Sequence, residues 1–128
     1  MALSNSSLYK VTVSGTDAVD QEYIYNALGE TAKITAMAIV PNVAVATHAS
    51  NYITLNVKRG STTIATFTTN SSGGAAMVAG TPIAMTITGT GGDLERASAG
   101  VFSVEVAKAG TGPAYDFAVV ATLQGIRV

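Results

Sequence analysis

The chain has 128 residues, of which 48% are apolar and only 12% are charged, and its formal net charge at pH 7 is −1. This length fits one domain, the apolar content excludes a disordered chain, and the charge balance excludes a basic surface for nucleic acid. The absence of cysteine excludes disulfides and thiolate metal sites. Because a typical domain carries about twice this share of charge, we expect much of the surface either to be covered by other protein or to be kept soluble by Ser and Thr hydroxyls.

The N-terminal residues 1–7 lack the basic and apolar regions of a secretory signal, and no stretch of the chain is apolar for long enough to form a membrane-spanning helix. We therefore expect synthesis in a cytoplasm and no membrane partner. Residues 1–7 are expected to form a flexible N-terminal arm, and residues 8–128 a single domain.

Apolar and polar residues alternate along most of the remaining chain, which is the period of β-strands. In chain order, the pattern predicts strands over residues 8–13, 19–25, 31–40, 52–58, 64–68, 82–88, 101–108 and 114–124. A helical turn fits residues 93–100. The last two strands are expected to turn one apolar set inward: Phe102, Val104 and Val106, then Tyr115, Phe117, Val119, Ala121 and Leu123.

The strand over residues 31–40 is apolar on both faces at its far end and stops at Pro41, which lacks a backbone donor. Such a strand is usually buried or covered on both sides. Strict alternation assigns the two faces as follows: Ile34, Ala36, Ala38 and Val40 on one, and Lys33, Thr35, Met37 and Ile39 on the other.

The clearest local signal is a hairpin around Gly60. A two-residue loop would pair Leu55 with Thr66, whereas a three-residue loop over residues 59–61 would pair Leu55 with Ala65 and Ile53 with Phe67. Only the second register keeps the apolar face intact, so we predict the three-residue loop, with a positive φ at Gly60.

About eight short strands separated by turn sequences, with no long helix, predict an all-β fold. The expected architecture is an antiparallel β-sandwich, and a jelly roll suits eight strands in two sheets best.

Residues capable of catalysis or metal binding are few. The single histidine, His48, lies in an expected exposed loop, and no Gly-x-Ser-x-Gly motif accompanies it. A glycosidase pair or a calcium site would have to come from eight acids, of which Asp17, Asp20 and Glu22 cluster in sequence, and no calcium-loop pattern is present. We therefore predict no enzyme activity, no cofactor and no metal. The acids are Asp17, Asp20, Glu22, Glu30, Asp93, Glu95, Glu105 and Asp116.

The layout from Val19 to Leu123 resembles the head decoration (capsid-stabilising) proteins of tailed bacteriophages, which are small β-sandwich virion proteins. Three stretches carry the resemblance: a strand of small apolar residues (32–41), a polar loop running into an alternating strand and hairpin (46–69), and an Ala-Gly turn, strand, Gly-Thr-Gly turn and closing strand (99–123). This chain has Val101 where related sequences often have an acid.

The resemblance implies a non-enzymatic structural protein that is made in the host cytoplasm and binds the outer surface of the major capsid protein shell, often as a homotrimer. Under that hypothesis, the expected contact elements are residues 1–8, 41–51 and 70–80. The alternative is a fibre or spike module that binds host glycans, for which the candidate stacking residues are the tyrosines Tyr9, Tyr23, Tyr25, Tyr52 and Tyr115.

Overall fold

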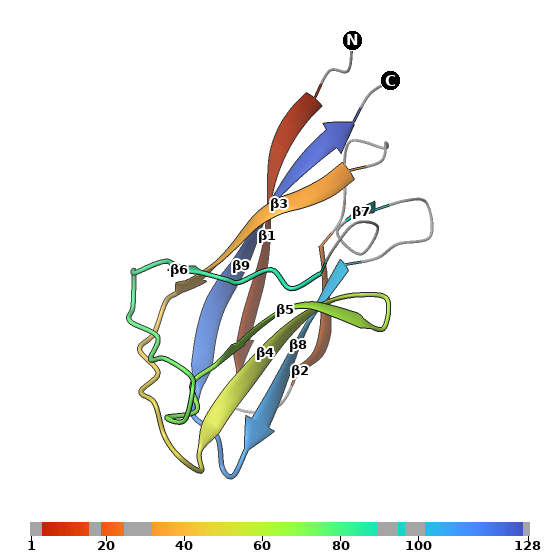
Figure 1. The fold of residues 1–128 in the computed structure, drawn as a ribbon. Helices are drawn as coiled ribbons and strands as arrows, with labels where there is room; N and C mark the ends of the chain where they lie inside the picture. The colour runs from red at the N-terminus through yellow and green to blue at the C-terminus, as the bar shows by residue number, and fades with distance from the viewer. Residues whose placement is uncertain (1–3, 16–18, 25–31, 90–94, 97–101, 127–128) are drawn as a thin grey trace.

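The computed structural model describes residues 4–15, 19–24, 32–89, 95–96 and 102–126, which form an antiparallel β-sandwich without helices (Figure 1). The predicted fold class is therefore confirmed. The described strands are β1 (Ser4–Gly15), β2 (Val19–Ile24), β3 (Ala32–Pro41), β4 (Tyr52–Arg59), β5 (Thr62–Thr68), β6 (Ile83–Ala84), β7 (Glu95–Arg96), β8 (Phe102–Ala109) and β9 (Tyr115–Ile126).

Two sheets make up the sandwich. Sheet A has the order β1-β9-β3-β6, with β7 also paired to β3, and sheet B has the order β2-β8-β4-β5. Leaving aside the two-residue β7, the strands of sheet A are first, eighth, third and sixth in the chain, and those of sheet B are second, seventh, fourth and fifth. This alternation of neighbours between two sheets is the strand order of a jelly roll, which contains two Greek keys.

The core lies between the sheets and is built by the alternation that the sequence predicts. Sheet B turns Ile53, Leu55 and Val57 inward, and β8 adds its three predicted residues. On sheet A, Phe117 and its alternate neighbours along β9 are buried, as predicted for residues 115–121. Two loop residues, Val45 and Met77, are also almost fully buried and close the core where the chain crosses between sheets.

Strand β1 begins earlier than expected. Residues 4–7, predicted to belong to a flexible arm, form the first part of β1 and pair with β9, from Ser4 opposite Ile126 onwards. At the other end of β1, Gly15 lies opposite Tyr115, so the ladder runs without interruption over twelve residue pairs.

The predicted strand over residues 82–88 is reduced to the two residues of β6. Its apolar face is nevertheless correct, since Met85 is buried and Ile83 and Ile87 pack against the core. Residues 95–96 form a strand instead of the expected helical turn, and the rest of that turn lies outside the described residues.

The face assignment of β3 is wrong beyond Ile34, because a β-bulge at Thr35 shifts the register with β9. The extra residue puts Ile34 and Met37 on the same side of the sheet. Met37 and Ile39 are therefore core residues, at 4% and 0% exposure, and the outer face of β3 carries alanine and valine instead.

The β4–β5 hairpin combines a two-residue turn with a bulge. Arg59 lies opposite Thr62 across the turn, and a register shift between Val57 and Lys58 then pairs Leu55 with Phe67. The predicted loop length and the Leu55–Ala65 pair are thus wrong, whereas the intact apolar face and the positive φ of Gly60, at 60°, are confirmed.

Candidate contact surface

Two acids, Glu105 and Asp116, have described side chains. Within the part of the chain that the structure describes, no three His, Cys, Asp or Glu residues are placed to hold a metal ion, and no helix could span a membrane. Glu105 forms a 3.2 Å salt bridge with Lys58 on the outer face of sheet B. Asp116 instead accepts a 3.1 Å hydrogen bond from Asn42 at the end of sheet A. These two carboxylates lie on different sheets and cannot act as a glycosidase pair.

The side chains of the remaining six acids are not described. Asp20, Glu22 and Glu95 lie in β2 and β7, but their side chains are not among those described. The other three, Asp17, Glu30 and Asp93, lie outside the described residues.

His48 is exposed, as expected, and its imidazole organises a turn. Nδ1 accepts hydrogen bonds from the backbone N–H groups of Ser50, at 3.0 Å, and Asn51, at 2.9 Å. A side-chain acceptor that binds N–H groups two and three residues later fixes a tight turn, as an Asn or Asp side chain does. The ring nitrogen therefore has a structural task in the connection between β3 and β4.

The tyrosines whose side chains are described form no exposed platform. Tyr115 is 2% exposed, and its ring packs at 5.7 Å from that of Phe117 in the core. Tyr52 is half-buried at the start of β4. Tyr9 and Tyr23 lie in strands without described side chains, and Tyr25 lies outside the described residues.

Two of the predicted contact elements lie together. Residues 41–51 run beside residues 69–80, and we call this pair of segments the paired loops. Val45 and Met77 exchange backbone hydrogen bonds of 3.0 and 2.8 Å, and the His48 N–H donates to the Thr69 carbonyl at 3.1 Å. Val43 and Val78, at 39% and 56% exposure, are the exposed large apolar residues among those described, and both lie in the paired loops.

Asn51 ties the paired loops to the β8–β9 turn. Its Oδ1 accepts from the backbone N–H of Thr111 at 3.1 Å and from the Thr111 hydroxyl at 3.2 Å. Gly110 has a φ of 62°, and a Cβ added there would collide with Asn51 Oδ1 and the carbonyl of Ser50. Three chain segments at this end of the sandwich are thus held as one unit.

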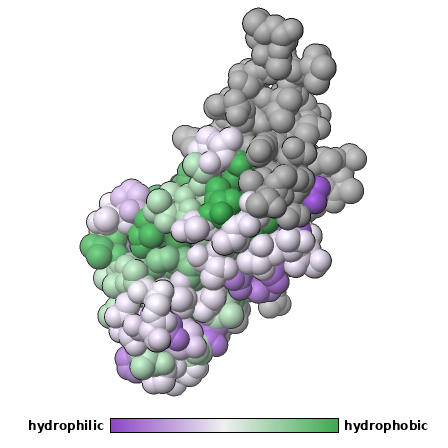
Figure 2. Space-filling view, in the orientation of Figure 1, coloured by the Kyte–Doolittle hydropathy of each residue, from purple (hydrophilic) through white to green (hydrophobic). Residues whose placement is uncertain are grey.

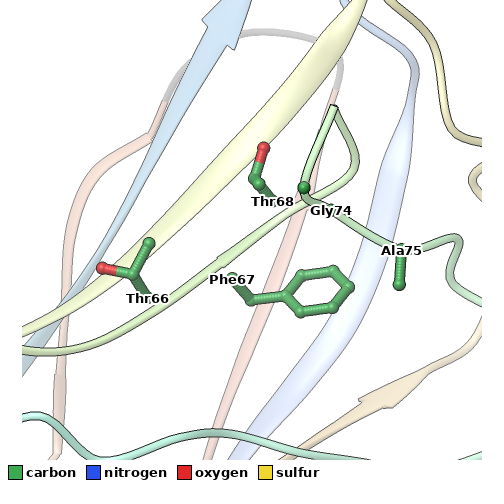
Figure 3. A pocket seen from close by; sticks show the side chains of 6 residues that line it. Thr66, Phe67, Thr68, Gly74 and Ala75 are labelled. Atoms are coloured by element: carbon green, nitrogen blue, oxygen red, sulfur yellow. The ribbon is translucent and has the colours of Figure 1, made fainter. Parts of the chain in front are cut away.

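A hollow of about 310 Å³ lies between the edge of β5 and the 73–75 segment. Figure 3 shows the Phe67 ring and the Ala75 methyl facing one another across it, whereas the Thr66 side chain points away. The Thr68 hydroxyl donates to the carbonyl of Ile53 and accepts from the N–H of Asn70. The hollow is therefore apolar and shallow, with no free polar group that would orient a ligand among the contacts described.

The outer face of sheet A carries small apolar side chains on β3, β6 and the middle of β9, and exposed polar side chains on β1, namely Lys10, Thr12 and Ser14. The register places Ala38 between Val120 of β9 and Ala84 of β6, and pairs Val40 with Ala118. Ala36 and Ala84 are exposed, and Ala38, Val40 and Val120 are half-buried. We call these residues the small-residue face: Ala36, Ala38, Val40, Ala84, Ala118 and Val120.

The outer face of sheet B is polar by comparison. The Thr66 hydroxyl donates to Asn56 Oδ1 at 2.9 Å, and the salt bridge of Lys58 lies on the same face. Figure 2 shows hydrophobic residues gathered on the side of the molecule along which the β6 segment runs. The part of sheet A formed by β3, β6 and the middle of β9 is therefore less polar than the outer face of sheet B, and the small-residue face together with the paired loops is the candidate contact surface.

The sequence alone did not identify the small-residue face, because the bulge at Thr35 decides which apolar set points outward. Comparisons with protein-family models, with curated proteins and with solved structures found no match.

Proposed function

We propose that this chain is a non-enzymatic structural protein of a tailed-phage virion, which binds the outer surface of the capsid and stabilises the head. The resemblance of the sequence layout to head decoration proteins is the starting point. Jelly rolls occur in viral capsid and lectin domains, but a fold does not define a function, so the proposal depends on the surface.

The observation that carries the proposal is the small-residue face. Side chains of Ala and Val let a second layer of protein approach a sheet closely, and sheets pack face to face at about 10 Å. Burying these six side chains removes no charge from water and leaves no side-chain donor or acceptor without a partner, whereas a partner that reached β1 would also have to accommodate Lys10, which lies opposite Val120. A capsid protein covering this face would gain stability through apolar area alone.

The paired loops add a second, firmly held contact region. Val43 and Val78 offer exposed apolar side chains on segments whose backbone is fixed by mutual hydrogen bonds. A surface that is ordered before binding loses less conformational entropy on association. In the proposed complex, the major capsid protein is the partner, and the resemblance implies that the chain binds as a trimer.

Binding to purified capsids tests the proposal. The protein should sediment with expanded capsids of the encoding phage, with a saturating copy number, and raise the temperature at which the heads rupture. Failure to bind capsids or any other component of the virion would contradict the proposal.

A pair of matched variants tests the surface. Ala36 and Ala107 are both exposed strand alanines, on the outer faces of sheets A and B. We expect Ala36→Glu to weaken capsid binding at least about tenfold, because an unpaired carboxylate would be buried, and Ala107→Glu to leave it unchanged. Equal effects of the two variants would remove the small-residue face from the interface.

A further inference from the structure

Three of the four sheet edges in the described structure are protected against strand addition. The edge of β5 is covered at Ile64, whose carbonyl accepts from Thr88 and Gly89, and at Thr68, whose carbonyl accepts from Ala75. Strand β6 has only two residues and follows a proline. Strand β2 has six residues, a register irregularity and two acids. Short strands, bulges, charges and covering loops are the devices that prevent edge pairing.

The fourth edge, β1, is long and regular. It has twelve residues, about twice the usual strand length, with no proline and no shift in its register with β9. Lys10 is its one charged residue. Figure 1 shows sheet A extending beyond sheet B at the end where the termini lie, so this part of β1 projects from the sandwich. Among the described strands, β9 is the only hydrogen-bonded neighbour of β1.

In an antiparallel strand, successive residues direct their backbone N–H and C=O groups to opposite sides of the strand, and this identifies the residues of β1 whose groups lie at the free edge. Asn42 donates its N–H to the carbonyl of Asp116, so Asp116 and alternate residues of β9 point toward β3. The intervening residues of β9 then point toward β1, where they pair with odd-numbered residues. The even-numbered residues of β1 consequently direct their N–H and C=O groups away from the sheet: Ser4, Ser6, Leu8, Lys10, Thr12 and Ser14.

We propose that a second copy of this chain pairs its own β1 antiparallel to this edge, joining two A sheets into one continuous sheet about a two-fold axis. A second copy is the occupant that the edges favour, because among the described strands β1 is the one edge left open, and a second copy presents the same open edge. An antiparallel pairing of identical strands is self-complementary, so both copies satisfy the same groups.

Lys10 excludes the register in which it faces itself, and the proposed register sets the two lysines well apart. Placing Lys10 opposite Lys10 would set two like charges directly across the ladder, which is destabilising. Placing Lys10 opposite Ser6 of the second copy moves the lysines about 14 Å apart along the strands. That register keeps the outward groups of even-numbered residues aligned and puts Leu8 on the two-fold axis.

This proposal does not depend on capsid binding, but it replaces the trimer that the resemblance implies with a dimer. A two-fold edge contact produces a dimer, of about 26 kDa from a 12.9 kDa chain, whereas the resemblance implies a trimer. Light scattering after size-exclusion chromatography measures the mass directly. A monomer or a trimer at about 100 µM would overturn the edge pairing without bearing on capsid binding.

Single cysteines test the register, because the chain has no cysteine of its own. Across the axis, Leu8→Cys would place two Cα atoms about 5.5 Å apart, within the range of a disulfide. In the same register two Thr12→Cys residues lie about 27 Å apart. Under mild oxidation with diamide, we expect a covalent dimer for Leu8→Cys and none for Thr12→Cys. Equal cross-linking of both variants would overturn the register.

A proline variant tests the backbone hydrogen bonds. The Ser6 N–H points away from β9, so Ser6→Pro removes a donor from the free edge and none from the β1–β9 ladder. We expect Ser6→Pro to be a monomer with unchanged circular dichroism, and Ser6→Ala, which keeps the donor, to remain a dimer. A folded Ser6→Pro protein with the dimer mass would contradict the proposal. If Ser6→Pro fails to fold, the cysteine pair decides the question.

Discussion

The Thr69 hydroxyl accepts a hydrogen bond that a backbone carbonyl would accept in a regular ladder. Removing this hydroxyl should destabilise the fold measurably. Thr69 is fully buried where β5 ends. Its N–H donates to the carbonyl of Ile53 at 3.0 Å, as in a regular ladder, but the Ile53 N–H donates to the Thr69 hydroxyl at 3.1 Å. The Thr69 carbonyl is thereby free to accept from His48 at 3.1 Å, which attaches the paired loops to the sheet.

The substitution Thr69→Val keeps the shape of the side chain and removes the acceptor. The Thr69 carbonyl would then have to accept from two donors, the N–H groups of Ile53 and His48, and one of these donors would be left without a hydrogen bond. Leaving a buried N–H unpaired costs about 1–3 kcal/mol. For a chain of 128 residues, an unfolding entropy of about 0.27 kcal/mol/K converts this loss into a Tm lowered by about 4–11 °C.

Thermal unfolding combined with amide hydrogen exchange measures both effects. We expect the exchange of Ile53 or His48 to accelerate in Thr69→Val. In Thr69→Ser, which keeps the hydroxyl and loses about 1 kcal/mol with its methyl group, both amides should stay protected. If Thr69→Val unfolds at the wild-type temperature with both amides still protected, the hydroxyl has no such role.

Two further predictions concern the turns. The free energy of unfolding in urea should change by less than about 0.5 kcal/mol in His48→Asn, because Asn can accept the same two backbone hydrogen bonds. In His48→Leu it should fall by about 1–2 kcal/mol. Equal losses in the two variants would show that Nδ1 is not the stabilising group. Gly60 and Gly110 both have φ near 60°, but a Cβ meets nothing within 4 Å at Gly60 and collides with Asn51 at Gly110. Gly60→Ala should therefore cost about 1 kcal/mol and Gly110→Ala clearly more, and a reversed order in their melting temperatures would contradict the geometry.

Local alternation predicted most of the strands and much of the core. In β4, β8 and β9 the side-chain period of two is unbroken, so the inward residues could be read directly from the chain, as for Leu55, Val104 and Phe117. The antiparallel sandwich followed from many short strands with turns between them. The order of strands within each sheet depends on contacts between segments far apart in the chain, and a local sequence pattern does not specify which segments make them.

The errors occurred where one residue interrupts a ladder. A bulge leaves the composition of a strand unchanged and reverses the faces beyond it, as Thr35 does in β3. The bulge in the β4–β5 hairpin similarly lets a two-residue turn keep the apolar face that strict alternation allows only with a three-residue loop. The candidate contact surface combines the paired loops, which the sequence already offers as contact elements, with the small-residue face, which depends on the Thr35 bulge.

The pairing of β1 with β9 has a consequence for how the chain folds. Strand β9 lies between β1 and β3, so sheet A has no central strand until the last described strand has been made. During synthesis the β4–β5 hairpin can form early, but β2 can join it only after β8 has been made, and β1 can pair only after β9 has been made. Pairing of the first strand with the last has a high loop-closure cost and produces slow folding. We therefore expect sheet A to assemble only after β9 has left the ribosome, with β1 unpaired during that interval.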